Sequence, residues 1–253
     1  FNGTEALAMG TVIGSNISNI ALIFGVSCIG VSMRPAKTNL VQFIPFAIAA
    51  IILGLVLLDL KITVIEGWVL LIIFALFIFI TYQYRGSEVD DQIEESATGT
   101  ITILLYLTVG LLALIGGSNF AVIHAEKIAY ILNVPQLIIG LTIIALGTSL
   151  PELAATISAI MKNKNDMVIG NVIGSNVMNI ALVLPIIGFF SDTSFDSTVL
   201  SRDYFVMLIA TILFVLLAAT YSSNKINLKF IRFVGCIFVA GYIGYILNLS
   251  NLI

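Results

Sequence analysis

Eight long apolar segments constrain what this chain can fold into. Runs of about 20 apolar residues are long enough to cross a bilayer as helices, and we place them at roughly 8–31, 40–58, 66–84, 99–120, 136–161, 167–190, 204–220 and 229–247. Only 10% of the residues are charged, against about 25% in soluble domains. The short alternating segments of a transmembrane β-barrel are missing from the pattern. The sequence therefore predicts an all-α polytopic membrane protein.

Two of these segments nearly repeat each other. Residues 10–22 are GTVIGSNISNIAL, and residues 170–182 are GNVIGSNVMNIAL. The copies are 160 residues apart (170 minus 10). Four other predicted spans lie between them, so the two copies must cross the membrane in opposite directions. Such an inverted-topology repeat is typical of secondary transporters.

Both copies place polar side chains inside an apolar span, where an unpaired polar group costs several kcal/mol. Residues spaced by four share one helix face, and the two faces consist of Thr11, Ser15 and Asn19, and of Asn171, Ser175 and Asn179. Because the face recurs in the inverted copy, we expect Ser15, Asn19, Ser175 and Asn179 to bind cations. The GxxxG glycines favour close helix packing instead. Whether Asn16 and Asn176 only bond backbone groups stays open.

The fifth span contains GLTIIALGTSLPEL at residues 140–153. Pro151 has no backbone N–H and crowds the carbonyl four residues earlier, so we expect a helix break that exposes nearby carbonyls. The oxygen donors gathered at this break are the carbonyl of Ala145 and the side chains of Thr148, Ser149 and Glu152. A set of hard oxygen donors suits Na⁺, Ca²⁺ or Mg²⁺, and not zinc or copper.

Glu152 is the one ionisable residue that we place in the middle of a span, and an intramembrane carboxylate is a functional candidate by default. An intramembrane enzyme with Glu152 as general base would need a second catalytic group at the same depth. We find none, and expect His124 to lie in the connection after the fourth span, so we do not expect an enzyme. The formal net charge of −3 gives no reason to expect a nucleic-acid partner.

At GTSLPE and the two GSNxxN segments, the whole chain resembles the sodium/calcium exchanger branch of the cation/calcium exchanger superfamily, of microbial type. The resemblance implies ten transmembrane helices in two inverted five-helix halves, of which this chain supplies the third to the tenth. It implies a secondary active antiporter that exchanges Na⁺ for Ca²⁺ by alternating access, with these ions as substrates and no prosthetic group. The alternative is a proton- or Na⁺-coupled exchanger of another divalent cation. The ligands that the resemblance implies are Ala145, Thr148, Ser149, Glu152, Ser175, Asn179, Ser15 and Asn19.

The chain departs from the family pattern in two respects. The repeat offset places the first-half counterpart of Glu152 about eight residues before Phe1, so we expect missing N-terminal helices that bring a second Glu. Without them, we expect the fragment not to transport. Asn179 stands where potassium-dependent exchangers have Asp, which argues against potassium dependence.

The resemblance and the charge pattern together predict the organisation and the orientation. We expect residues 1–84 to be the remainder of the first repeat (helices 3–5), 85–98 an acidic cytoplasmic linker, and 99–253 a complete second repeat (helices 6–10). Eight Lys and Arg lie in or beside one set of alternate connections and three in the other, which places the richer set in the cytoplasm. The protein would be a multi-pass protein of the cell membrane. The acidic residues within 85–98 favour a solvated linker over a regulatory cation site.

Overall fold

A computed structural model describes residues 4–30, 40–84, 100–162, 164–190, 194–222 and 227–250. The predicted linker at 85–98 lies outside the described residues. The first half of the chain forms α1 (Thr4–Ile17), η1 (Ser18–Phe24), α2 (Gly25–Gly30), η2 (Leu40–Gln42), α3 (Phe43–Val56), η3 (Leu57–Asp59) and α4 (Val64–Gln83). The second half forms α5 (Thr100–Ile131), α6 (Gln136–Ile139), η5 (Gly140–Ile144), α7 (Ala145–Thr148), α8 (Leu150–Met161), α9 (Asn165–Met178), η6 (Asn179–Val183), α10 (Leu184–Phe190), η7 (Val199–Tyr204), α11 (Phe205–Ser222) and α12 (Leu228–Leu249).

Eight helical segments in the described part of the chain are long and apolar enough to cross a membrane. They are Glu5–Gly30, Leu40–Asp59, Val64–Gln83, Ile101–Ile131, Gln136–Met161, Met167–Phe190, Val199–Thr220 and Leu228–Leu249. The predicted all-α membrane fold is therefore confirmed. Most boundaries differ from the prediction by a few residues, because hydropathy marks the apolar part of a helix and not its ends.

The fourth span is the exception, because its helix continues to Ile131 and not to about residue 120. His124 therefore lies within α5 and not in a connection, with its Nδ1 2.8 Å from the carbonyl oxygen of Phe120. The polar residues of this stretch, Glu126 and Lys127, end the apolar run. They are good helix formers, so they do not end the helix.

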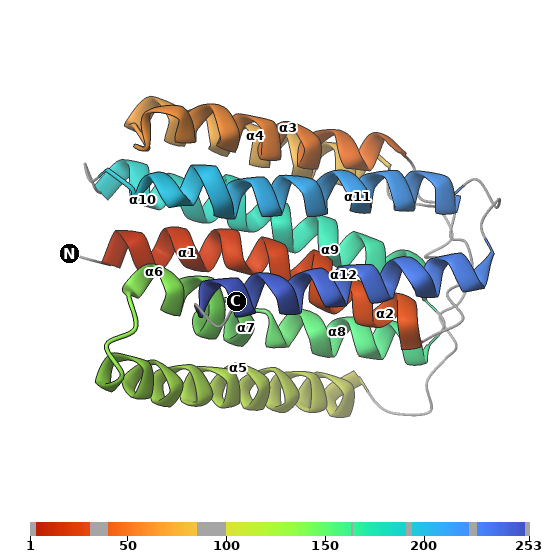
Figure 1. Ribbon diagram of the computed structural model, residues 1–253. Coiled ribbons are helices and arrows are strands. Elements are labelled where there is room, and N and C mark those ends of the chain that lie inside the picture. The colour runs from red at the N-terminus through yellow and green to blue at the C-terminus, as the bar shows by residue number, and fades with distance from the viewer. Residues whose placement is uncertain are drawn as a thin grey trace.

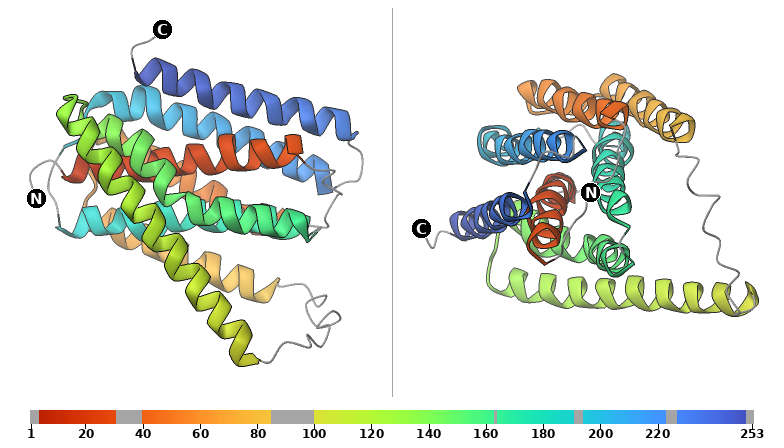
Figure 2. Two further views of the ribbon diagram at one scale, coloured as in Figure 1. Left: turned by 90° about the horizontal axis from the view of Figure 1, so that it is seen from below. Right: turned by 90° about the vertical axis from the view of Figure 1, so that its right-hand side faces the viewer.

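The spans form an elongated bundle in which successive spans run in opposite directions (Figure 1). The copy of the repeat in α1 and η1 points one way along the bundle, and the copy in α9 and η6 points the other way. This opposed direction is what the four spans between the two copies predict. α5 lies at one side of the bundle and is strongly inclined to the other helices (Figure 2).

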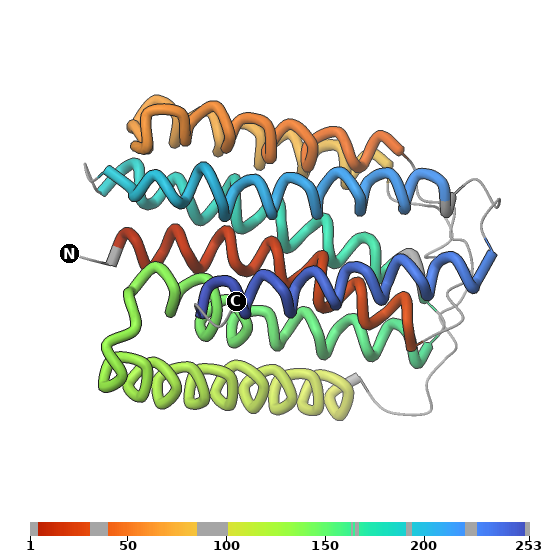
Figure 3. The backbone as a smooth tube through the Cα atoms, in the orientation of Figure 1, coloured from red at the N-terminus to blue at the C-terminus, as the bar shows by residue number. Residues whose placement is uncertain are grey.

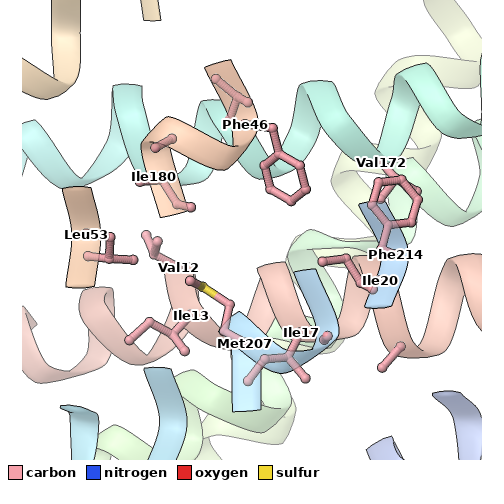
Figure 4. Close-up of a cluster of buried hydrophobic side chains, with 14 of the residues drawn as sticks. Val12, Ile13, Ile17, Ile20, Phe46, Leu53, Val172, Ile180, Met207 and Phe214 are labelled. Carbon is pink, nitrogen blue, oxygen red and sulfur yellow. The ribbon is translucent and has the colours of Figure 1, made fainter. Parts of the chain in front are cut away.

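The first repeat copy occupies the centre of the bundle. In the most apolar stretch of the Glu5–Gly30 span 83% of residues are buried, against 6% in the α5 span. Side chains of α1 meet those of α3, α9 and α11 in one core (Figure 4), which includes Ile13, Phe46, Val172 and Phe214. A span that is mostly buried by protein has few lipid contacts. Its polar face is therefore available for a function inside the bundle.

The two halves of the chain are interleaved. α1 packs along α6, η5 and α7 of the second half, while α12 packs along α2 and η1 of the first. α4 packs against α10 in the same manner. The tube in Figure 3 shows α1 beside the α6–α7 segment along its length. Any site between α1 and α7 is therefore built from both halves.

Glycines allow the close approach of α1 to the second half. A Cβ atom at Gly10 would lie 2.6 Å from the carbonyl oxygen of Leu137, and one at Gly14 would lie 2.5 Å from that of Leu141. Gly140 makes the reciprocal close approach to α1, because a Cβ atom there would meet the carbonyl oxygen of Leu7. The first GxxxG pair thus packs helix against helix, as its sequence predicts.

In the described part of the chain, four segments of the spans wind as π-helices, namely η1, η5, η6 and η7. η1 and η6 follow the polar faces of the two repeat copies at equivalent places. π-helical turns are rare and occur frequently at functional sites. Hydropathy and spacing gave no sign of them.

Candidate ion-binding site

The helix break at Pro151 is confirmed. α7 ends at Thr148 and α8 begins at Leu150 with the proline in its first turn. Ser149 stands between them with φ −86° and ψ −2°. Glu152 consequently lies in the first turn of α8, where the positive end of the helix dipole stabilises a carboxylate.

Ser15 joins the first repeat copy to the broken helix. Its Oγ lies 3.0 Å from Thr148 Oγ1 and 3.4 Å from the carbonyl oxygen of Ala145. The Thr148 hydroxyl also donates to the carbonyl oxygens of Ile144, at 3.0 Å, and Ala145, at 3.2 Å. The Ala145 carbonyl accepts from the Ser149 amide as well, at 3.2 Å. Three of the predicted ligands thus form one cluster, in which the Ala145 carbonyl has several donors around it.

Ser149 is paired with Ser18, a residue that the sequence analysis missed. The two hydroxyl oxygens are 2.9 Å apart, and Ser18 also donates to the carbonyl oxygen of Ser15 at 3.1 Å. Ser18 is fully buried and Ser149 nearly so. The repeat gave no signal for Ser18, because the equivalent position in the second copy is Met178.

Glu152 is half-buried, and the side chain of Ser175 is hydrogen-bonded to its carboxyl group. The second carboxyl oxygen, Oε2, is buried without a hydrogen-bond partner. Behind the carboxyl group, the Asn171 amide donates to the Glu152 carbonyl at 3.0 Å and to Thr156 Oγ1 at 2.9 Å. Among the described residues there is no cluster of three or more Asp, Glu, His or Cys, and Glu152 is the carboxylate among the predicted ligands.

The asparagines of the two copies meet at the centre. Asn19 Nδ2 donates to Asn176 Oδ1 at 3.3 Å, and Asn16 Nδ2 donates to the carbonyl oxygen of Val12 at 2.9 Å. Asn16 therefore forms a hydrogen bond to the backbone of its own helix, whereas Asn176 accepts a hydrogen bond from Asn19 of the other repeat copy. Asn19 Oδ1 is buried without a partner and is available as a ligand. Asn179 is half-buried at the start of η6, which packs against α1.

A cavity of about 480 Å³ lies between α5, α8 and α9. Glu152, Pro151 and Asn171 line one side of it, and Tyr106 and Leu111 of α5 line the other. The carboxylate-bearing turn therefore borders open space and is not enclosed by packed side chains.

Comparisons with known proteins identify similar sequences and structures. The family model described as sodium/calcium exchanger protein matches residues 1–83 and 102–250. CaxA of Alkalimonas amylolytica is 36% identical over 97% of this chain and 79% of its own length. The sodium/calcium exchanger MaX1 of Methanosarcina acetivorans is 40% identical over 45% of this chain and 33% of MaX1.

Among solved structures, the sodium-calcium exchanger NCX_Mj, soaked with Na⁺ and Sr²⁺, superposes with a TM-score of 0.73 at 30% identity. The superposition covers 94% of this chain and 75% of the NCX_Mj chain. The likeness extends over the helices that hold the candidate ligands and is not confined to one half.

Proposed function

This chain belongs to the sodium/calcium exchanger family, and from that premise we propose that the complete protein exchanges Na⁺ for Ca²⁺ across the cell membrane by alternating access. The observation that supports this proposal is a group of oxygen atoms in the middle of the bundle, drawn from both inverted repeats. We propose as cation ligands the carbonyl of Ala145 and the side chains of Thr148, Ser149, Glu152, Ser175, Asn179, Ser15 and Asn19. Buried acceptors without partners, Glu152 Oε2 and Asn19 Oδ1, are suited to receive a cation.

The electrostatics of this site call for a second carboxylate. A Ca²⁺ ion held by Glu152 alone would leave an uncompensated charge in a low-dielectric interior, which is costly. We propose that the second Glu comes from helices that precede Phe1 in the complete protein, at the position related to Glu152 by the repeat. The matched relatives CaxA and NCX_Mj both extend beyond the part that this chain covers, which leaves room for such helices.

The glycines of the second repeat copy indicate where an upstream helix would pack. Gly10 and Gly14 of the first copy are in tight contact with the helix that contains GTSLPE. At the equivalent Gly170, a Cβ atom would meet nothing within 4 Å, and at Gly174 it would meet only Phe77, at 3.9 Å. By the same symmetry, the upstream helix would pack on Gly170 and Gly174, beside the cavity at Glu152.

Shared ligands provide the coupling between the two ions. One Ca²⁺ would be bound by the two Glu residues together with hydroxyl and carbonyl oxygens, and Na⁺ ions would use Ala145, Thr148, Ser15 and Ser175 in overlapping positions. Occupancy by one ion then excludes the other. A neutralised site can be occluded during the change of access, whereas two bare carboxylates cannot, because burying them is too costly.

The orientation follows from the basic residues. The ends of α8 and α11 and the starts of α9 and α12 lie at the same end of the bundle (Figure 1). Lys162, Lys164, Lys229 and Arg232 lie at or near them. We propose that this end faces the cytoplasm.

The test is Na⁺-gradient-driven uptake of radioactive Ca²⁺ into proteoliposomes that contain the full-length protein. We expect Glu152→Gln to abolish uptake, because the change removes the charge but keeps the size of the side chain. The matched control is Glu126→Gln, the same change on α5, which we expect to leave uptake intact. Equal uptake by wild type and Glu152→Gln would remove Glu152 from the site.

Other results would replace the proposed ion pair. Uptake that ignores Na⁺ but follows a pH gradient would move the protein to proton coupling. If another divalent cation competes with Ca²⁺ and is transported in its place, that cation would be the substrate. The proposed mechanism of exchange by alternating access would stay the same.

A further inference from the structure

We propose that Ser18 is a positioning residue for cation binding, which acts by drawing the hydroxyl proton of Ser149 away from the ion. The inference rests on the proposed function, since it needs a cation at the site. It concerns a residue outside the predicted ligand set, whose place in the repeat is taken by Met178 in the second copy.

The number of hydroxyl protons decides which serine donates. A serine hydroxyl has one proton to donate and two lone pairs with which to accept. Ser18 Oγ lies 3.1 Å from the carbonyl oxygen of Ser15, and a carbonyl can only accept, so the single proton of Ser18 is used there. In the 2.9 Å contact between Ser18 and Ser149, Ser149 must therefore be the donor.

This order of donation leaves the Ser149 oxygen in the state that a cation needs. Its proton points along the contact toward Ser18, and a lone pair remains for an ion on the other side. We define the proton relay as the sequence Ser149 hydroxyl, Ser18 hydroxyl, Ser15 carbonyl. Both serine side chains are buried, so water does not offer an alternative acceptor for the Ser149 proton.

The neighbouring pair, Ser15 and Thr148, needs no extra residue. Thr148 donates to the carbonyl oxygens of Ile144 and Ala145, and Ser15 donates to the Ala145 carbonyl oxygen as well. Thr148 reaches backbone carbonyls on its own helix, whereas the Ser149 hydroxyl has Ser18 as its partner among the described residues. Ser149 therefore depends on a side chain from the other half of the protein.

The relay is also asymmetric between the repeats. The residue related to Ser18 by the 160-residue offset is Met178, whose thioether is a weak acceptor, and Met178 is 46% exposed. A hydroxyl in the upstream counterpart of Ser149 would therefore lack this support. Two otherwise similar halves would bind cations with unequal strength.

The test is a double-mutant cycle of Ser18→Ala and Ser149→Ala in the full-length protein. Removing Ser18 takes away the acceptor that holds the Ser149 proton, so the hydroxyl is free to turn that proton toward the ion. We expect the cation concentration for half-maximal flux to rise about tenfold, equivalent to about 1.4 kcal/mol, with the maximal rate retained. In the Ser149→Ala background, Ser18→Ala should have no further effect. Ser18→Thr, which keeps the hydroxyl, should restore the wild-type value.

The matched control is Ser27→Ala. Ser27 is a buried serine on the adjoining helix α2, and its hydroxyl donates to the carbonyl oxygen of Ile23 at 2.7 Å. Ser27→Ala should leave the half-maximal concentrations of Na⁺ and Ca²⁺ unchanged. If Ser18 only holds two segments together, Ser18→Ala would lower the melting temperature and leave these concentrations unchanged too. Additive effects of Ser18→Ala and Ser149→Ala would equally overturn the relay.

A second measurement separates this proposal from the proposed function. The purified protein in detergent is titrated with Na⁺, Ca²⁺, Mg²⁺ or Mn²⁺, and the rise in melting temperature reports binding. If wild type shows no Na⁺-driven Ca²⁺ flux but a cation stabilises it, the relay still predicts weaker stabilisation of Ser18→Ala by that cation. If none of these cations stabilises wild type, Ser149 is not a cation ligand and the relay is wrong.

Discussion

Replacing Gly14 with Ala tests whether the contact between α1 and η5 sets the geometry of the ion site. The new Cβ atom would lie 2.5 Å from the carbonyl oxygen of Leu141 and 2.7 Å from the Cβ of Ala145. Ordinary contact begins at 3.4 Å, so the two helices must separate by about 0.9 Å. Both close neighbours are backbone or a short side chain, and neither can rotate away.

The cost follows from this displacement. Overpacking of a close-packed interface costs about 1–3 kcal/mol, and the gain in helix propensity from Gly to Ala returns about 1 kcal/mol. We therefore expect Gly14→Ala to lower the free energy of unfolding by at most about 2 kcal/mol. The same shift would stretch the 3.0 Å contact between Ser15 and Thr148 beyond hydrogen-bond length. Flux should fall at least tenfold, because the contact that joins Ser15 to the broken helix is lost.

The assay compares thermal unfolding of the full-length protein in detergent with Na⁺-dependent Ca²⁺ flux in proteoliposomes. The control is Gly241→Ala in α12, where a Cβ atom would meet nothing within 4 Å, and which should keep both properties. If Gly14→Ala unfolds and transports as wild type does, the close approach of α1 does not position the site.

Three further substitutions test other contacts. Gly170→Ala touches nothing in the described chain, but in the full-length protein it should lower the melting temperature if an upstream helix packs there; an unchanged melting temperature would count against that helix. Asn171→Leu removes the two hydrogen bonds between α9 and α8 and should cost about 1–3 kcal/mol in unfolding experiments, with weaker cation binding; unchanged binding would show that Asn171 does not position the carboxylate turn. Tyr245→Phe removes the 2.9 Å bond to the fully buried Asp203 and should cost about 1.5–3 kcal/mol, without a change in the cation concentration for half-maximal flux.

The amino-acid sequence determined the parts of the structure that depend on local pattern. Span positions follow from the length of apolar runs, and the opposed direction of the two repeats follows from counting crossings. The break at Pro151 follows from the missing N–H. The same reasoning misplaced the end of α5, because polar helix formers end an apolar run without ending the helix. It also missed the π-helices, whose extra residue per turn leaves no periodic sign in such apolar spans.

Partner choice across the bundle was decided only by the tertiary structure. The spacing of Ser15, Asn19, Ser175 and Asn179 identified a polar face on each repeat copy, but it did not say that Ser15 meets Thr148. Serine and asparagine side chains are short, so their partners depend on shifts of about 1 Å between helices. Those shifts are fixed by glycine contacts between segments about 130 residues apart. For the same reason Ser18, absent from the repeat pattern, became visible only when its hydroxyl was placed against Ser149.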